Sequence, residues 1–190
     1  FEEKNNLTHA GVNLVQEGDI ISIDSGSTAV LFAKALKGKF NKLTVITHSL
    51  DVFRELEQEG QYKKILVGGE YLDSESSFCG ELAIQFLDEI HVEKAFICPS
   101  AVSLEGGIQD FITELVPVQK SFVRHASKVY VMADSSKIEK TALMKICDLS
   151  VCDVVITDDK LDERIKEHYF QAKVKIMKAG EVYEKTSEEE

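Results

Sequence analysis

The sequence has few basic residues for its number of acidic ones. Its 190 residues include 22 Lys and Arg against 33 Asp and Glu, which gives a formal net charge of −11 at pH 7. Proteins that bind a nucleic-acid backbone use Lys and Arg to displace counterions from the phosphates. The composition therefore argues against DNA or RNA binding by these 190 residues.

Long apolar runs, a secretory signal and paired cysteines are also missing. No segment approaches the roughly 18 consecutive apolar residues of a membrane span, and the first residues lack the basic and apolar regions of a signal peptide. The four cysteines form no Cys-x-x-Cys pair, and no group of His, Asp and Glu has metal-ligand spacing. We therefore expect a cytoplasmic protein with reduced thiols, no metal, no cofactor and no membrane partner.

The sequence does contain two alternating apolar patterns. Short runs rich in Val and Ile suit strands that are buried on both faces, as in a parallel sheet. These runs are Ile20–Ile23, Leu43–Ile46, Ile65–Val67, Ala95–Cys98, Val129–Met132, Val154–Ile156 and Val174–Met177. Helical spacing occurs between them, in Thr28–Leu36, Leu50–Gln58, Gly80–Leu87 and Glu114–Ala126. The alternation predicts an α/β fold with a doubly wound, mostly parallel, Rossmann-like sheet.

The first predicted strand is followed by a segment with the composition of an anion-binding turn. The segment is Asp24-Ser25-Gly26-Ser27-Thr28, and it leads directly into a predicted helix. Gly26 permits a tight turn, and the amides at the start of a helix bind phosphate readily. The alternative is that Ser27 or Thr28 only caps the helix. The segment matches neither the Gly-x-Gly-x-x-Gly nor the Walker motif, so neither nucleotide class is predicted.

Polar residues also follow the other predicted strands. In chain order they are Thr47, His48 and Ser49, then Gly69 and Glu70, then Ser100 with Glu114 and Lys120 on the next helix, and finally Asp134 and Lys137. Ligands of open α/β sheets bind beyond the carboxyl ends of the strands. Hydroxyls, carboxylates and lysines at that edge predict a site for a polyhydroxylated, anionic small molecule. No Ser or Cys nucleophile is tied to His48 by spacing, so no catalytic residue is predicted.

These blocks, in this order, resemble the C-terminal effector-binding domain of the DeoR family of bacterial transcription regulators. The similarity extends from about Leu7 to Met177. It rests on Gly18–Thr28, Leu43–Ser49, Leu66–Glu70, Lys94–Ile97, Glu114 with Lys120, and Ala133–Lys137. The resemblance implies the fold of ribose-5-phosphate isomerase, glucosamine-6-phosphate deaminase and coenzyme A transferases. It also implies a phosphorylated sugar or related metabolite that binds as a signal.

The resemblance assigns the polar residues to parts of one pocket. It implies that Asp24, Ser25, Gly26, Ser27 and Thr28 lie nearest the phosphate, that Thr47, His48 and Ser49 line the floor, that Gly69 and Glu70 approach the sugar, and that Glu114, Lys120, Asp134 and Lys137 close the pocket. The sequence departs from the family pattern at two places. His48 stands where many members have Asn, and Cys98–Ser103 replaces an acidic Gly-Ala-Asp-Gly-Ile-Asp run. Loss of those carboxylates removes candidate general bases, which favours sensing over catalysis.

The resemblance also implies a domain organisation. We expect a linker and covering helix in residues 1–18, the latter near Thr8–Gln16, an effector-binding domain in residues 19–180 and an acidic tail in residues 181–190. A small insertion is expected between Gly69 and Val92. Family members also carry an N-terminal winged helix-turn-helix, for which this chain has no room, and the missing initiator Met fits a fragment.

The leading hypothesis is the sensing domain of a homo-oligomeric transcription repressor that contacts DNA only through the absent N-terminal domain. One alternative is a sugar-phosphate isomerase or deaminase on the same fold, with Glu114 as base and Lys120 as electrostatic stabiliser. The other is an interaction module with a vestigial pocket.

Overall fold

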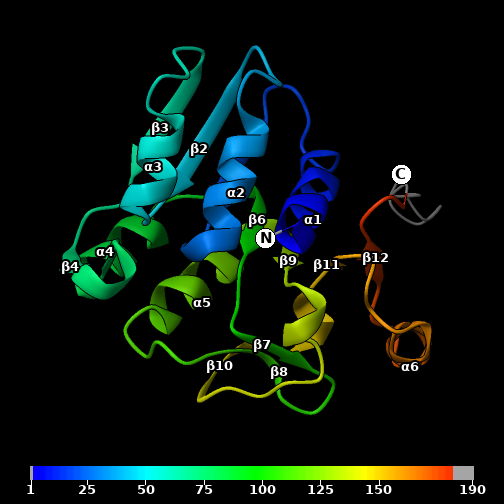
Figure 1. Cartoon of the computed structure of the whole chain (residues 1–190). Helices are drawn as coiled ribbons and strands as arrows, with labels where there is room; N and C mark the ends of the chain where they lie inside the picture. Colours follow the sequence, from blue (N-terminus) through cyan, green and yellow to red (C-terminus); the bar gives the residue numbers. More distant parts are fainter. Residues whose placement is uncertain (1, 182–190) are drawn as a thin grey trace.

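A seven-stranded sheet forms the centre of the protein (Figure 1). The computed structural model describes residues 2–181, so all of the predicted acidic tail except Glu181 lies outside the described residues. The strand order is β12-β11-β9-β6-β1-β2-β3, and every neighbouring pair is parallel. The strands are β1 (Ile20–Ile23), β2 (Leu43–Thr47), β3 (Tyr62–Leu66), β6 (Val92–Ile97), β9 (Ala126–Met132), β11 (Val154–Thr157) and β12 (Ile176–Lys178). The predicted doubly wound parallel sheet is confirmed, and each predicted apolar run overlaps one strand.

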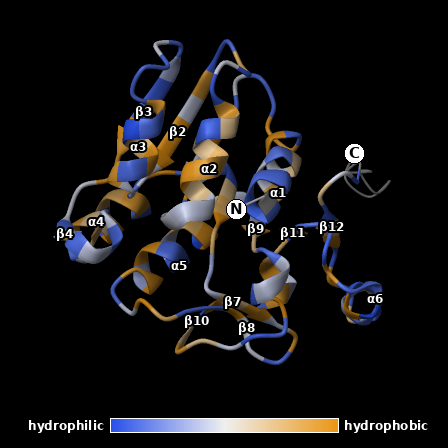
Figure 2. Ribbon diagram, viewed as in Figure 1, coloured by the Kyte–Doolittle hydropathy of each residue, from blue (hydrophilic) through white to orange (hydrophobic). Residues whose placement is uncertain are grey.

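Helices cover both faces of this sheet. Apolar side chains of α1 (Glu2–Val12), α2 (Gly26–Leu36) and α3 (Leu50–Leu56) belong to the core on one face, whereas those of α4 (Glu81–Asp88), α5 (Val116–Arg124) and α6 (Glu163–Gln171) belong to the core on the other. The covering helix α1 begins before the expected Thr8 and ends at Val12. Helix α6 was not predicted, because most of its residues are polar and Tyr169 alone is fully buried. Figure 2 shows the difference, with β2 and α2 mostly hydrophobic and α6 largely hydrophilic.

The core on the α1–α3 face is built around stacked aromatic rings. The ring of Phe32 in α2 lies 4.5 Å from that of Phe96 in β6, which in turn lies 5.3 Å from the ring of Tyr130 in β9. Helix α1 packs closely over this stack because it carries Gly11 there. A Cβ atom at Gly11 would lie 3.1 Å from the sulfur of Met132 and 3.2 Å from the ring of Phe32.

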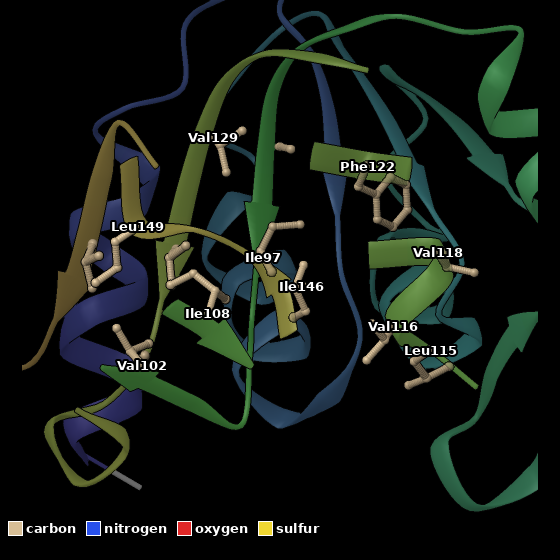
Figure 3. Close-up of a cluster of buried hydrophobic side chains, with 14 of the residues drawn as sticks. Ile97, Val102, Ile108, Leu115, Val116, Val118, Phe122, Val129, Ile146 and Leu149 are labelled. Atoms are coloured by element: carbon tan, nitrogen blue, oxygen red, sulfur yellow. The ribbon is translucent and has the colours of Figure 1, made fainter. Parts of the chain in front are cut away.

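The core on the opposite face joins the main sheet to a second, smaller sheet (Figure 3). The strands β7 (Ala101–Ser103), β8 (Gly107–Asp110) and β10 (Met144–Cys147) form this antiparallel sheet in the order β10-β8-β7. Val102, Ile108 and Ile146 of this sheet belong to the same cluster of buried side chains as Phe122 of α5. The sequence did not predict this sheet, because strands of three or four residues carry too little pattern to be separated from loops.

The segment in which an insertion was expected contains a hairpin and helix α4. The hairpin strands are β4 (Glu70–Leu72) and β5 (Ser77–Cys79), and the single-turn 3-10 helix η1 (Asp73–Glu75) connects them. The hairpin is tied to the loop after β2, since Leu50 N donates to Ser76 O and Phe78 N donates to His48 O, both at 2.8 Å. Among the described residues, none of the helices has the length and apolarity needed to cross a bilayer.

Replacement of Phe32 by Ala tests the aromatic stack. Phe32 is fully buried, so Phe32→Ala removes its ring contacts and opens a cavity that the sheet cannot collapse to fill. We expect a loss of about 3–5 kcal/mol in the free energy of unfolding, measured by urea denaturation. Phe170→Ala is the matched control, because Phe170 is 69% exposed. An equal loss in both variants would contradict this account of the core.

Candidate functional site

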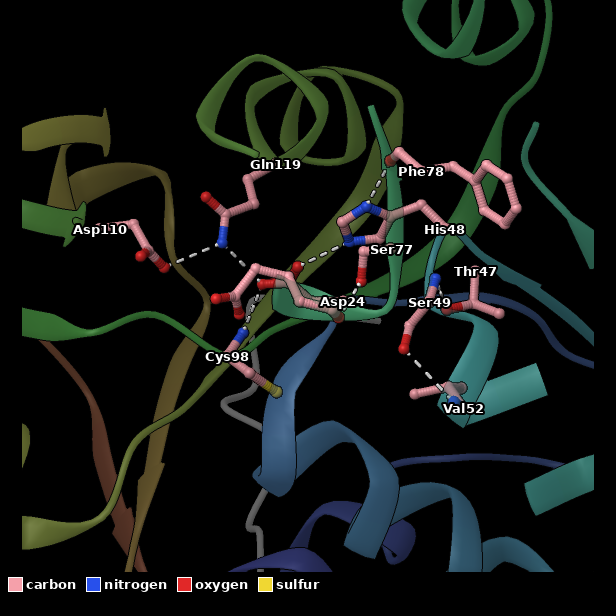
Figure 4. A network of polar contacts seen from close by, with 11 residues as sticks. Asp24, Thr47, His48, Ser49, Val52, Ser77, Phe78, Cys98, Asp110 and Gln119 are labelled. Carbon is pink, nitrogen blue, oxygen red and sulfur yellow. Dashed lines mark hydrogen bonds and ion pairs between the residues drawn. The ribbon is translucent and has the colours of Figure 1, made fainter. Parts of the chain in front are cut away.

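The candidate site is organised around the carboxylate of Asp24, which follows β1 directly. The side chain is fully buried. Its Oδ2 accepts hydrogen bonds from Cys98 N at 2.9 Å and from Gln119 Nε2 at 3.0 Å, and its Oδ1 lies 3.1 Å from His48 Nε2 (Figure 4). One carboxylate therefore connects the ends of β1, β2 and β6 to helix α5. A charge buried this deeply is stable only when its oxygens are hydrogen-bonded.

His48 connects this carboxylate to the β4–β5 hairpin. The side chain is fully buried, and its Nδ1 lies 3.0 Å from the carbonyl oxygen of Phe78. A carbonyl only accepts, so Nδ1 carries a hydrogen and donates it. The contact between Nε2 and Asp24 Oδ1 is a hydrogen bond as well. Both ring nitrogens of His48 are therefore engaged with protein partners.

Gln119 and Asp110 extend the network towards a cavity, and sequence reasoning missed both. Gln119 Nε2 donates to Asp24 and also to Asp110 Oδ2 at 3.1 Å. Asp110 Oδ1 accepts from Ser100 Oγ at 2.8 Å and from two backbone amides. A sequence signal for Gln119 existed: it is a polar residue four positions after Leu115, on the apolar face of the predicted helix. Asp110 gave no such signal, because the short sheet that carries it was not predicted.

The amide oxygen of Gln119 has no hydrogen-bond partner among the described residues. Its amide nitrogen serves two carboxylates, so the oxygen points away from both. Gln119 is only 1% exposed, and an unpaired acceptor at that depth costs about 1–3 kcal/mol. A hydroxyl group of a ligand would satisfy this oxygen.

Gln119 and Asp110 border a cavity of about 240 Å³ at the carboxyl ends of β1 and β6. Its lining comprises Ser25, Gly26, Ser27, Glu75, Cys98, Ser100, Asp110, Ile112, Leu115, Gln119 and Lys137. Five of the residues predicted to bind ligand are thus brought together here: Ser25, Gly26, Ser27, Ser100 and Lys137. Their role in binding stays a prediction.

The start of α2 and Lys137 give one side of the cavity a positive character. Ser25 occupies the N-cap position but its side chain makes no capping hydrogen bond in the described structure, and Gly26 has a φ of +89°, which favours glycine. The first-turn amides of α2 therefore lack a side-chain cap from Ser25. Lys137 Nζ donates to Pro99 O at 2.7 Å and retains two further hydrogens for a ligand. Burial and then Asp24 raise the pKa of the Cys98 thiol well above its usual range, although Lys137 lowers it, so this lining residue is a neutral thiol.

The remaining predicted residues lie outside the cavity lining. Asp24, Thr47, His48 and Ser49 are buried beneath it, where Thr47 Oγ1 accepts from Ser49 N and Ser49 Oγ accepts from Val52 N at the start of α3. Thr28 and Asp134 are also buried, and Asp134 caps the 3-10 helix η2 (Ser135–Lys137) by accepting from Ser136 N. Gly69 lies against the backbone of Cys79, while Glu70, Glu114 and Lys120 are exposed. Their roles in ligand binding also stay predictions. Within residues 2–181, no group of three or more His, Cys, Asp and Glu side chains is placed to hold a metal ion.

Known proteins match most of the chain. The family described as the DeoR C terminal sensor domain matches residues 1–159. The chain is 34% identical over 161 residues to the transcriptional repressor AccR of Agrobacterium fabrum. The matched region covers 82% of this chain and 60% of AccR. The chain is 30% identical over 171 residues to the lactose phosphotransferase system repressor of Lactococcus lactis, with coverages of 90% and 67%. The chain therefore spans between 60% and 67% of the length of these two relatives.

Solved structures with this fold include a ribose 5-phosphate isomerase and eIF2B beta. Ribose 5-phosphate isomerase A from Methanocaldococcus jannaschii superposes with a TM-score of 0.50 at 20% identity, covering 71% of this chain and 53% of that one. The beta subunit of eIF2B from Chaetomium thermophilum superposes with a TM-score of 0.57 at 13% identity, covering 82% and 48%. At these identities the likeness shows the fold alone, and it confirms the predicted fold.

Replacement of Asp24 by Ala tests whether the buried carboxylate holds the site together. Asp24→Ala removes both carboxylate oxygens, so Cys98 N and Gln119 Nε2 lose an acceptor and His48 Nε2 loses its partner. We expect a loss of about 3 kcal/mol or more in the free energy of unfolding, measured by urea denaturation. Asp159→Ala, at an exposed position, is the control and should change it by less than about 0.5 kcal/mol. A wild-type value for Asp24→Ala would show that the network does not depend on this carboxylate.

Proposed function

Because the chain belongs to the DeoR C-terminal sensor-domain family, we propose that it senses a phosphorylated sugar or a related metabolite for a bacterial transcription repressor. The ligand would bind in the cavity between the start of α2 and Gln119. The observation that carries this proposal is the unpaired, buried oxygen of Gln119, which shares one cavity with Lys137 and the uncapped start of α2. That cavity is therefore lined both by groups that attract an anion and by a group that accepts a hydrogen bond.

The start of α2 and Lys137 suit the phosphate group. The N-terminal end of a helix carries a partial positive charge and free amides, and both favour an anion. Helix α2 has no acidic residue in its first turn to neutralise that charge internally. The Lys137 ammonium, which lines the same cavity, adds a charge-assisted hydrogen bond.

Gln119 and its neighbours suit the hydroxyl groups of a sugar. The free oxygen of Gln119 accepts from one hydroxyl, and Ser100, which shares Asp110 as a partner with Gln119, lines the same cavity. The volume of about 240 Å³ is below the roughly 300–1,000 Å³ of sites for drug-sized ligands. A small phosphorylated metabolite fits this size better than a dinucleotide.

The response to the ligand would be a change in DNA binding by another part of the parent protein. The relatives named as repressors are longer than this chain, and these 190 residues carry a net charge of −11. We propose that a winged helix-turn-helix outside these residues contacts DNA in a homo-oligomer. Ligand binding regulates it only if the ligand favours one arrangement of domains or subunits over another.

The first test is ligand binding, measured as a shift in melting temperature. Ribose 5-phosphate, glucosamine 6-phosphate and other phosphorylated sugars are compared with the unphosphorylated sugars. A ligand at 100 times its Kd adds about 2.7 kcal/mol of stability, which corresponds to a shift of roughly 5–10 °C. Lys137→Met should abolish the shift, whereas Lys120→Met should preserve it because Lys120 is exposed outside the cavity lining. Absence of a shift across the panel at millimolar concentration would sink the proposal.

The second test is catalysis, which we expect to be absent. Proton transfer between carbons of a sugar phosphate needs a base with a free lone pair near the substrate. Asp110 is held by a hydroxyl, an amide side chain and two backbone amides, and both ring nitrogens of His48 are occupied. Ribose 5-phosphate incubated with the protein should therefore show no isomerisation by NMR. Turnover that is lost in Glu114→Gln or Glu75→Gln would establish the enzyme alternative instead.

A further inference from the structure

Lys4, in the first turn of α1, reaches the start of α2. Its Nζ donates a hydrogen bond to Ser27 Oγ at 2.8 Å, and Ser27 is the second residue of α2. Lys4 lines a second cavity of about 520 Å³, whose lining shares Gly26, Ser27 and Glu75 with the 240 Å³ cavity. The two cavities therefore adjoin at the turn between β1 and α2, and Lys4 stands at that junction.

The position of Lys4 is electrostatically unfavourable without an anion. The ammonium contacts a neutral hydroxyl at the positive end of a helix dipole, where negative rather than positive charge is stabilised. Within the described residues no carboxylate lies within 4.0 Å of it, although Asp51 and Glu75 line the 520 Å³ cavity with it. The neighbouring Glu3, by contrast, is paired with Lys160. An anion at the start of α2 would give Lys4 a partner of opposite charge.

We propose that Lys4 is a ligand of the anionic group of the effector, and that effector binding thereby fixes the first turn of α1 to α2. The proposal rests on the function proposed above. The phosphate would bind to the first-turn amides of α2 and accept from Lys4 Nζ in place of the Ser27 hydroxyl. The field of Lys4 already reaches the site, since the pKa of the Cys98 thiol, which burial raises most strongly, is lowered by Lys137 and also by Lys4.

This contact would link ligand occupancy to one end of α1 rather than to the whole helix. Leu7, Ala10 and Leu14 are buried in the core, and Gly11 lies against Phe32 and Met132, so the later turns are fixed with or without ligand. The first turn makes polar contacts near the surface, which include Glu3 with Lys160 and Lys4 with Ser27. A phosphate between Lys4 and α2 would add a contact to this turn.

The experiment is an NMR titration of the full 190-residue chain with inorganic phosphate and, separately, with ribose 5-phosphate. Four proteins are compared: wild type, Lys4→Gln, Lys4→Arg and Glu3→Gln. We expect Lys4→Gln to weaken binding about tenfold, because it removes one charge-assisted contact, and Lys4→Arg to restore most of the affinity. Glu3→Gln is the matched control, since it removes the other charged contact of the same turn and should leave affinity unchanged. Melting temperatures without ligand should agree with wild type within about 2 °C.

Hydrogen exchange of the α1 amides gives a second readout, which a purely structural role for Lys4 would not move. Ligand should slow exchange in the first turn of α1 in wild type but not in Lys4→Gln. Equal affinity in Lys4→Gln and wild type, or equal losses in Lys4→Gln and Glu3→Gln, would overturn the inference. If binding is lost in Lys137→Met but kept in Lys4→Gln, the role of Lys4 fails while the proposed function stands. If wild type binds neither probe nor any sugar phosphate of the panel, the proposed function fails and the role of Lys4 with it.

Discussion

The buried carboxylate of Asp24 is the interaction on which the site depends. It lies where β1 ends, and its hydrogen bonds fix the positions of His48, Cys98 N and Gln119. Burying a charge costs several kcal/mol unless its oxygens are paired, so these partners have little freedom to move independently. The main sheet thus places the ends of β1, β2 and β6 near one another, and the hydrogen bonds of Asp24 fix their relative positions. The wall of the cavity is a consequence of that arrangement.

The polar groups of this region fall into two layers with different chemistry. The lower layer consists of Asp24, His48 and Asp110, which form hydrogen bonds with other groups of the protein. In the upper layer, Lys137, the first turn of α2 and the oxygen of Gln119 keep capacity for another molecule. A rigid layer beneath an unsatisfied one suits recognition, because a ligand then finds its partners already in place. Because the acids and the imidazole of the lower layer are engaged with protein partners, they are poorly placed to exchange protons with a ligand.

The sequence predicted the main sheet well because its strands are buried on both faces, so Val and Ile runs such as Ile20–Ile23 stand out from their surroundings. It predicted the turn at Gly26 from glycine and hydroxyl chemistry at a strand end. It did not separate residues that face the cavity, such as Ser27, from residues that lie beneath it, such as His48, because both follow strands at similar spacing. The polar Gln119 on an apolar helix face was visible in the sequence, but its bonds to Asp24 and Asp110 join distant segments, and local patterns do not encode such contacts.

The hairpin β4–β5 supplies Glu75 to both cavities without being part of the main sheet. Its attachment to the site beneath uses main-chain groups, namely Phe78 O with His48 and Ser76 O with Leu50 N. Those bonds use no side chain of η1 (Asp73–Glu75), so they place little restriction on the side chains there. Evolution is therefore free to change the residues of η1, and with them the shape and charge of one cavity wall, while the Asp24 network and the sheet stay intact. A fold built in this way can acquire new ligands by altering a few residues of one surface turn.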